Sequence, residues 1–438
     1  MSTEELDWAS APWHTRILII MVCINLGCFG GIIFGWPPLL LIFQREDQYN
    51  ELCTVDGCSE QENALNWMYV LGCSVINLCA FPLGILLDMI GPKWLSIMGA
   101  GTAAVGFFCM AVSDSATLDY FPLGISLIAI TGQLSMLFLY PVSFLLQSKT
   151  TILTIGSCCF DASSLVFMLF QLLNEYASIS RTILFAVWGG FAFLTFGTLA
   201  VLWNGMDKSG TKDTDVYVQD VSKPQQRTKD VLFTKNGKSA KTKTNTFGKQ
   251  NSALFTEVYS FKFLFAVLYG SVLCFRANTH VAISKKLLEN YGDDDHTYVL
   301  IFSWILPFGF IAMPAVNILI DKYGLHNTIM GCHFFGVLYN IIAMIPCLEL
   351  QLVGFVLFSA YRAVSFATLI AFNGNTFSLP NIGKIVGLIF CCAALVNFAA
   401  QPCMTVTNAY FNGNLLPVNT ILLLLQFVLI AATFKLGK

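Results

Sequence analysis

Twelve apolar segments, each long enough to cross a lipid bilayer as a helix, constrain this chain more than any other feature. A bilayer core of about 30 Å needs about 20 helical residues, and the segments run roughly over 17–43, 64–87, 94–113, 119–146, 151–173, 182–203, 261–284, 298–320, 327–346, 351–372, 385–409 and 415–435. The chain is 56% hydrophobic and only 11% charged, whereas an ordinary soluble domain is about 25% charged. The sequence therefore predicts an all-α membrane protein and argues against a cytosolic enzyme.

The order of these segments divides the chain into two six-helix halves. We predict a cytosolic N-terminus over 1–16, an N-terminal six-helix bundle over 17–203, a linker over 204–257 and a C-terminal six-helix bundle over 258–436. The linker has a polar composition typical of disorder and carries ten basic residues. Lysine and arginine gather on the cytosolic side of membrane proteins, so we expect both termini to be cytosolic. We attribute the basic linker to topology rather than to nucleic-acid binding.

A short motif occurs at corresponding places in the two halves. The copies are GILLDMIGPK, which contains Gly84, Asp88, Gly91 and Lys93, and NILIDKYGLH, which contains Asp321 and Gly324. Repeated halves are typical of transporters. The motif resembles the loop between helices two and three of the major facilitator superfamily, where it locks the cytosolic side. The resemblance implies a twelve-helix major facilitator fold and a gating role for these residues; simple helix capping is the alternative.

Three ionisable residues lie deep within the apolar segments. Asp161 is near the centre of the fifth segment, Arg362 is near the centre of the tenth, and Arg276 is in the outer half of the seventh. A charged side chain facing lipid costs several kcal/mol, so such residues pair or face a water-filled path. One acid and two bases leave a spare positive charge that suits a substrate with a carboxylate. We predict substrate binding by all three; a purely structural Asp161–Arg362 pair is the alternative.

The run FGWPPLL interrupts the first apolar segment. Pro37 and Pro38 lack N–H groups and leave carbonyls one turn earlier without helical donors. Irregular backbone at membrane depth survives only where it lies against protein or lines a cavity, so the run either contacts substrate or shapes helix packing. The remaining predicted substrate contacts are Gly35 and Trp36 of this run, Ser163 and Ser164 beside Asp161, and Asn397 and Gln401 on the eleventh segment.

The fifteen cysteines lie mostly inside apolar segments, where cysteine is usually a small buried hydrophobe. Their spacing is not typical of a metal site. Cys53 and Cys58 differ, because they lie in the polar loop after the first segment. If that loop faces an oxidising compartment, the two can form a disulfide.

Taken together, several of these stretches resemble solute carrier family 43. They are FGWP followed by REDQYNELC, then FDASSLVF, the arginine of the tenth segment, and GKIVGLIF. That family contains sodium-independent facilitators of large neutral amino acids and a purine nucleobase facilitator. The resemblance implies movement of an amino acid or a nucleobase down its gradient, with no cofactor. Pro38 and the run AVSFATLIAFNGN after Arg362 depart from the family pattern, which leaves the identity of the substrate open.

The leading prediction is a carrier for neutral amino acids that works by alternating access, as a monomer, in the plasma membrane. Arg362 would hold the substrate carboxylate, and Asp161 with the neighbouring serines would hold its ammonium group. The expected partners of the protein are this small-molecule substrate and the surrounding membrane lipid, with no nucleic acid. One alternative is a purine nucleobase facilitator, in which Asp161, Asn397 and Gln401 contact the base edges. Others are a proton-coupled symporter that uses Asp161, and a sensor that binds without transport. We find no nucleophile motif or phosphate loop that would indicate an enzyme.

Overall fold

Helices make up almost all of the part of the chain that the structure describes. The structure, a computed structural model, describes residues 11–53, 59–143, 145, 149–208, 256–377, 382–411 and 413–436. In these residues the secondary structure is helical apart from one isolated bridge between Asp114 and Leu118. Ten of the described helices are long and apolar enough to cross a membrane. The prediction of a helical, multi-pass membrane protein is confirmed, whereas the twelve spans and their superfamily arrangement stay predictions.

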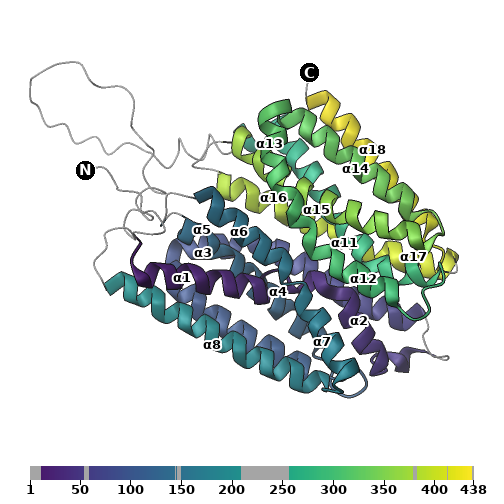
Figure 1. The fold of residues 1–438 in the computed structure, drawn as a ribbon, viewed down its shortest axis with the longest axis horizontal. Helices are drawn as coiled ribbons and strands as arrows, with labels where there is room; N and C mark the ends of the chain where they lie inside the picture. Colours follow the sequence, from purple (N-terminus) through teal and green to yellow (C-terminus); the bar gives the residue numbers. More distant parts are fainter. Residues whose placement is uncertain are drawn as a thin grey trace, which may run out of the picture.

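The N-terminal half forms one group of helices, purple to teal in Figure 1. Its elements are α1 (Trp13–Asn25), η1 (Leu26–Gly30), η2 (Ile32–Gly35), α2 (Trp36–Arg45), η3 (Asn50–Leu52), α3 (Ser59–Val112), α4 (Phe121–Leu137), α5 (Leu139–Ser143), α6 (Lys149–Ala162), α7 (Leu165–Tyr176) and α8 (Arg181–Lys208). The long α3 contains two predicted spans, joined at a kink where Gly91 leaves helical geometry. Helix α1 begins before the predicted first span, and α8 continues into the predicted linker.

The C-terminal half forms the second group, green to yellow in Figure 1. Its elements are α11 (Phe261–Glu289), α12 (Thr297–Ile305), η4 (Leu306–Ala312), α13 (Met313–Tyr323), α14 (Leu325–Ala343), α15 (Leu348–Thr376), α16 (Ile382–Asn397), α17 (Ala400–Phe411) and α18 (Leu416–Leu436). The broken helix α12–η4–α13 occupies the predicted span 298–320, and α14 occupies 327–346. Residues 209–255, most of the predicted linker, lie outside the described residues.

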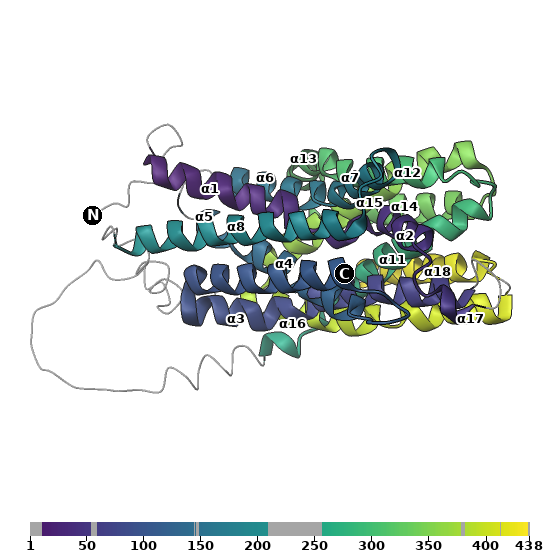
Figure 2. The ribbon, with the colours of Figure 1, turned by 90° about the horizontal axis from the view of Figure 1, so that it is seen from below.

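The two halves meet along three lines of contact. Helix α3 runs beside α16 and α17, α6 contacts η4, and α2 contacts α11 and α12. Figure 2 shows the same arrangement from below, with α3, α16 and α17 on one side of the molecule. Following the predicted topology, we call the end that carries Cys53 and Arg181 the outer end, and the opposite end, where α1 begins, the inner end.

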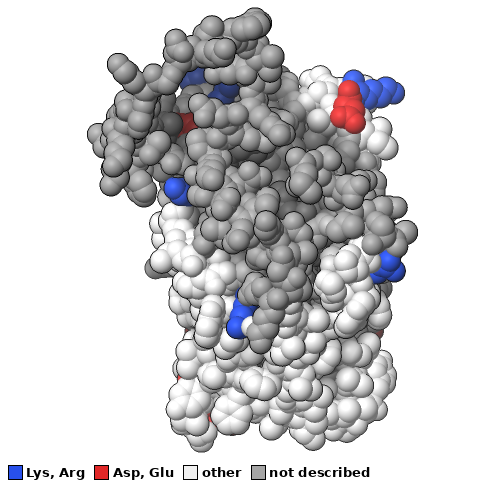
Figure 3. Space-filling view, turned by 90° about the vertical axis from the view of Figure 1, so that its left-hand side faces the viewer, with Lys and Arg blue, Asp and Glu red and all other residues white. Residues whose placement is uncertain are grey.

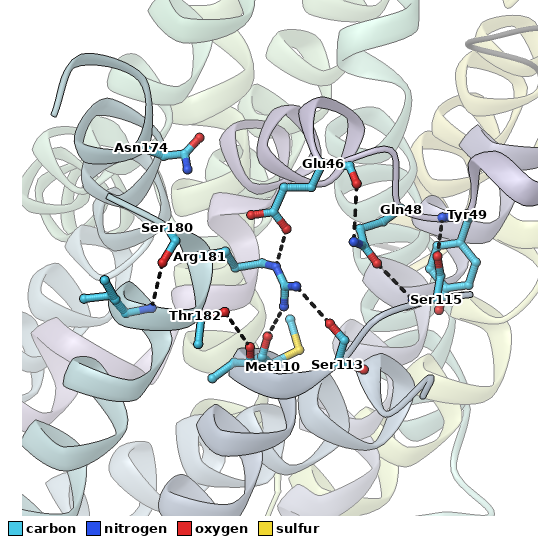
Figure 4. A network of polar contacts seen from close by, with 12 residues as sticks. Glu46, Gln48, Tyr49, Met110, Ser113, Ser115, Asn174, Ser180, Arg181 and Thr182 are labelled. Atoms are coloured by element: carbon cyan, nitrogen blue, oxygen red, sulfur yellow. Dashed lines mark hydrogen bonds and ion pairs between the residues drawn. The ribbon is translucent and has the colours of Figure 1, made fainter. Parts of the chain in front are cut away.

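One buried arginine fastens the outer end of the N-terminal half (Figure 4). Arg181, at the start of α8, pairs with Glu46 just after α2 and donates to the main-chain oxygens of Met110 and Ser113 near the end of α3. Its side chain is only 7% exposed. A charge buried this deeply needs hydrogen-bond acceptors and a counter-charge. Because these come from α2 and α3, Arg181 holds the ends of α2, α3 and α8 together.

The loop after α2 is also hydrogen-bonded to the turn between α3 and α4. The Tyr49 hydroxyl donates to Asp119 at 2.8 Å, and the Tyr49 N–H donates to the Ser115 hydroxyl at 2.7 Å. Burial, followed by the hydrogen bond to Asp119, raises the pKa of Tyr49. The hydroxyl therefore remains a donor at physiological pH, and the loop is held against the turn before α4.

The inner end of the molecule is viewed directly in Figure 3. In the described part of this face, Lys and Arg side chains lie at several separate places, whereas acidic side chains are few. Lys93 belongs to this end, where its ammonium group donates to Asn204 of α8 at 2.8 Å. The cytosolic orientation of this end stays a prediction.

Candidate functional site

An ion pair between the two halves lies at the centre of the molecule. A terminal guanidinium nitrogen of Arg362, on α15, donates to a carboxylate oxygen of Asp161, on α6, at 2.8 Å. The two side chains are only 7% and 11% exposed. The Arg362 guanidinium also lies over the ring of Phe34, 5.3 Å from its centroid. The structure thus brings together the two charged residues that the sequence analysis singled out, one from each half.

The backbone of the first predicted span breaks beside this pair. Between α1 and α2 the chain passes through the π-helical turn η1 and the 3₁₀ turn η2, and α2 restarts at Trp36 with Pro37 in its first turn. Proline is tolerated there because the first N–H groups of a helix have no helical acceptor. The break that FGWPPLL predicts is therefore present, one turn before the prolines.

The two serines after Asp161 bond to backbone in this structure. The Gly31 N–H donates to the Ser163 hydroxyl at 2.6 Å, and that hydroxyl donates to the Phe160 carbonyl. The Ser164 hydroxyl donates to the Asp161 carbonyl at 2.8 Å. The Ser163 hydroxyl therefore provides a hydrogen-bond acceptor for an N–H group in the irregular part of the first span. The Ser164 hydroxyl provides a donor for a carbonyl at the end of its own helix. These are structural contacts, and the predicted substrate contacts of both serines remain untested.

Gly35 allows two backbones to touch. A Cβ atom at this position would lie 2.2 Å from the Ser164 carbonyl oxygen, so no other residue fits without movement. Its φ of −79° is ordinary, so the need for glycine is steric. The close approach places Phe34 against the fifth predicted span, where its ring centroid lies 6.0 Å from that of Phe160. Gly35 thus positions its neighbours, and its predicted contact with substrate stays a prediction.

Trp36 is fully buried beneath the outer end. Its ring stacks on the ring of Tyr69, on α3, with centroids 5.7 Å apart and planes 29° apart. Both residues have 0% exposure. Tyr69 was not among the predicted site residues, because a single tyrosine in an apolar segment is most often packing. Its position beside Trp36 could be found only from the fold.

Arg276 is held by neutral groups inside the C-terminal half. It is fully buried and donates to the Tyr361 hydroxyl, to Gln426, to the Gly336 carbonyl and to Asn340. These acceptors lie on α14, α15 and α18, so Arg276 of α11 joins four helices. These four hydrogen bonds use the terminal nitrogens of the guanidinium, while its Nε–H has no acceptor among the described residues. Substrate binding by Arg276 stays a prediction.

Asn397 and Gln401 bond across the seam between the halves. The Asn397 amide donates to the Ser74 hydroxyl at 2.9 Å and accepts from Asn278 at 2.9 Å. The Gln401 amide donates to the Asn63 carbonyl, also at 2.9 Å. Both predicted contact residues therefore lie on the surface of α16 and α17 that faces α3. In this structure their amide groups hold the halves together, and substrate binding by them remains a prediction.

The two copies of the repeated motif have the same backbone geometry. Gly91 has φ +78° and ψ 170°, and Gly324 has φ +81° and ψ 158°. Positive φ is a conformation that glycine adopts readily and other residues avoid, which explains the glycine in each copy. Asp321 is exposed, Gly84 has open space around it, and the Asp88 side chain is outside the described part of the chain. The gating role stays a prediction.

The outer end of the seam carries opposite charges from the two halves. Glu62 of α3 lies 3.6 Å from the Lys286 ammonium group of α11, and Lys285 pairs with Glu289 one turn away. A polar cavity of about 300 Å³ opens here and is lined from both halves. Every positive charge at this cavity has a carboxylate neighbour, so the cluster closes the seam rather than leaving an open anion site.

Cys53 is disulfide-bonded, and the other thirteen cysteines of the described residues are free. Cys58 lies outside the described residues, so its pairing with Cys53 stays a prediction. No group of three or more His, Cys, Asp or Glu side chains that could hold a metal occurs in the described part of the chain.

Several known proteins are similar in sequence to this chain, whereas no family model matches it. It is 25% identical to Protein FMP42 of Saccharomyces cerevisiae over 93% of this chain and 92% of that protein. It is 23% identical to Equilibrative nucleobase transporter 1 of Bos taurus over 98% and 97%. It is 26% identical to Large neutral amino acids transporter small subunit 3 of Mus musculus, over only 40% and 34%. The chain is thus related to membrane transporters of small molecules.

Proposed function

We propose that this protein is a carrier that moves neutral amino acids across a membrane by alternating access, with the substrate inserted between Asp161 and Arg362. The observation that supports the proposal is the buried ion pair that joins one residue of each half. A group bound there touches both halves, so its binding can be coupled to their relative motion. Each half supplies one charge of opposite sign, which matches the two charges of a zwitterion.

Charge balance explains why a neutral amino acid suits this site. The Asp161–Arg362 pair carries no net charge, and a zwitterion that separates the pair leaves the site neutral again. The substrate carboxylate replaces Asp161 on Arg362, where bidentate hydrogen bonds are available, and the ammonium group takes the freed carboxylate. A cationic amino acid would leave one buried charge unpaired, at a cost of several kcal/mol. The rings of Phe34 and Phe160, with centroids 6.0 Å apart, offer an apolar surface for the side chain.

A purine nucleobase is the second candidate. It is favoured by the similarity to the bovine nucleobase transporter, which extends over 98% of this chain. A guanidinium donor beside a carboxylate acceptor also matches the donor and acceptor edge of a purine. In this case Arg362 would donate to ring nitrogen or carbonyl oxygen and Asp161 would accept from an N–H group.

Uptake into proteoliposomes separates these candidates. Labelled leucine is offered with unlabelled phenylalanine or adenine, at equal pH on both sides. We expect leucine entry that phenylalanine blocks and adenine does not. Arg362→Ala should abolish this entry while the protein still reaches the membrane, whereas Arg45→Ala should not, because Arg45 is 47% exposed in its surface pair. Adenine transport without leucine transport would select the nucleobase function, and dependence on a pH gradient would select proton coupling through Asp161.

A further inference from the structure

Three buried hydrogen-bond donors on the outer side of the ion pair have no oxygen or nitrogen acceptor among the described residues. They are the indole N–H of Trp36, the hydroxyl of Tyr69 and the Nε–H of Arg362. Buried polar groups are paired in the great majority of cases, so each unpaired one needs a physical explanation. Leaving a donor without an acceptor costs about 1–3 kcal/mol, and three such donors in one region indicate a place built for an acceptor.

The contacts place these donors together. Trp36 stacks on Tyr69, and Phe34, two residues before Trp36, lies under the Arg362 guanidinium. Tyr69 and Arg362 also interact electrostatically. On its own helix the Tyr69 hydroxyl interacts with the thiol of Cys73, and a thiol is a weak acceptor. A carboxylate oxygen would accept a much stronger hydrogen bond from the same hydroxyl.

The depth of each residue puts the aromatic pair on the outer side of Arg362. Tyr69 follows the outer start of α3 at Ser59 by about 15 Å, at 1.5 Å per helical residue. By the same rise, Arg362 lies about 21 Å inward from the start of α15 at Leu348. Trp36 and Tyr69 thus form a layer between the charged outer seam and the central pair.

We propose that Tyr69 is a specificity-determining residue, which together with Trp36 donates hydrogen bonds to the carboxylate oxygens of a substrate held on Arg362. This rests on the proposed function and deepens it. The carboxylate end of the substrate faces the outer layer of donors, and the ammonium end faces Asp161. The site selects for an acceptor group at this position, because a ligand without one leaves three donors unpaired.

The test compares two conservative variants in proteoliposomes. Tyr69→Phe removes one hydroxyl and leaves the ring. Loss of a hydrogen bond to a charged group should raise the KM for leucine about tenfold or more, with kcat unchanged. 3-Methylbutylamine has the side chain and the amine but no carboxylate, so it leaves Arg362 unpaired and should compete only weakly; its inhibition constant should be the same in Tyr69→Phe as in the wild type. Tyr339→Phe is the control, since Tyr339 is 1% exposed and its hydroxyl is also unpaired, but it stacks within the C-terminal half; it should change neither value.

Each result decides the proposal. An unchanged KM for leucine in Tyr69→Phe overturns it, and so does an equal loss of affinity for leucine and for the amine, which would indicate general distortion. Elution as a single peak in size-exclusion chromatography shows that the variant is folded. If the wild-type protein transports adenine and not leucine, the amino-acid function has failed separately, and a raised KM for adenine would still support Tyr69 as a donor to substrate. If it transports neither, the proposed function and the role of Tyr69 fail together.

Discussion

Replacing Gly35 by alanine tests whether the first and fifth predicted spans require backbone contact. The new Cβ would lie 2.2 Å from the Ser164 carbonyl oxygen and 3.1 Å from its carbonyl carbon. Since a comfortable carbon–oxygen contact is above about 3 Å, α2 must move outward by about 1 Å. Overpacking of this kind costs about 1–3 kcal/mol.

Gly101→Ala is the matched control for this substitution. Gly101 is a helical glycine in α3, and a Cβ at its position would have no atom within 4 Å. Alanine there should stabilise the helix by up to about 1 kcal/mol, because glycine is the less favourable residue in a helix interior. The two variants should thus change the free energy of unfolding in opposite directions and differ by about 1–4 kcal/mol.

Thermal unfolding of the purified protein in detergent measures the difference. We expect the order Gly101→Ala, wild type, Gly35→Ala, from highest to lowest Tm. Uptake should fall in Gly35→Ala as well, because a shift of about 1 Å in a binding group can reduce a rate by about a hundredfold. Equal Tm values for the two alanine variants would refute the steric argument and return Gly35 to the list of candidate ligand contacts.

Three further substitutions test other parts of the structure. Arg181→Met removes a buried charge that holds three helix ends and should lower stability by about 3–5 kcal/mol, whereas Arg45→Met should cost less than about 1 kcal/mol; urea or heat denaturation compares them. Gly324→Ala imposes positive φ on alanine and should lower stability by about 1–2 kcal/mol, while Gly331→Ala in α14, which meets no atom within 4 Å, should not. Glu62→Gln weakens a partly exposed pair, so it should leave stability within about 1 kcal/mol. In a Gln44→Cys background, which places a thiol in the lining of the outer cavity, it should increase labelling by a membrane-impermeant reagent; unchanged labelling would argue against a closing role.

The sequence predicted the features that depend on local chemistry. Helical spans follow from apolar length, the break in the first span follows from two prolines, and the isolation of Asp161 and Arg362 in apolar segments predicts that they must be solvated by protein. Their pairing was one of two alternatives, and the fold brings the two side chains within 2.8 Å. The positive φ of Gly91 and Gly324 agrees with the glycine that each copy of the motif contains.

Features that depend on packing between distant segments could not be predicted. Arg276 was expected at the substrate, but its hydrogen bonds come from residues 60 to 150 positions away, and no local pattern indicates them. Tyr69 looks like ordinary packing until Trp36 is placed against it. Asn397 resembles a ligand contact in sequence, since an amide inside a membrane needs a partner, and only the fold shows that the partner is Ser74 of the other half.

The seam between α3 and the helices α16 and α17 has a mechanical consequence. Its bonds reach α3 at Asn63, Ser74 and Leu78, positions that recur on one stripe of a helix. Because these contacts lie along one line, they restrain the two halves from sliding past each other. They leave rotation of one half against the other about that line comparatively free, as an axle does. Groups far from the axle travel furthest for a given turn, so the seam can stay bonded while the opposite edges of the two halves part.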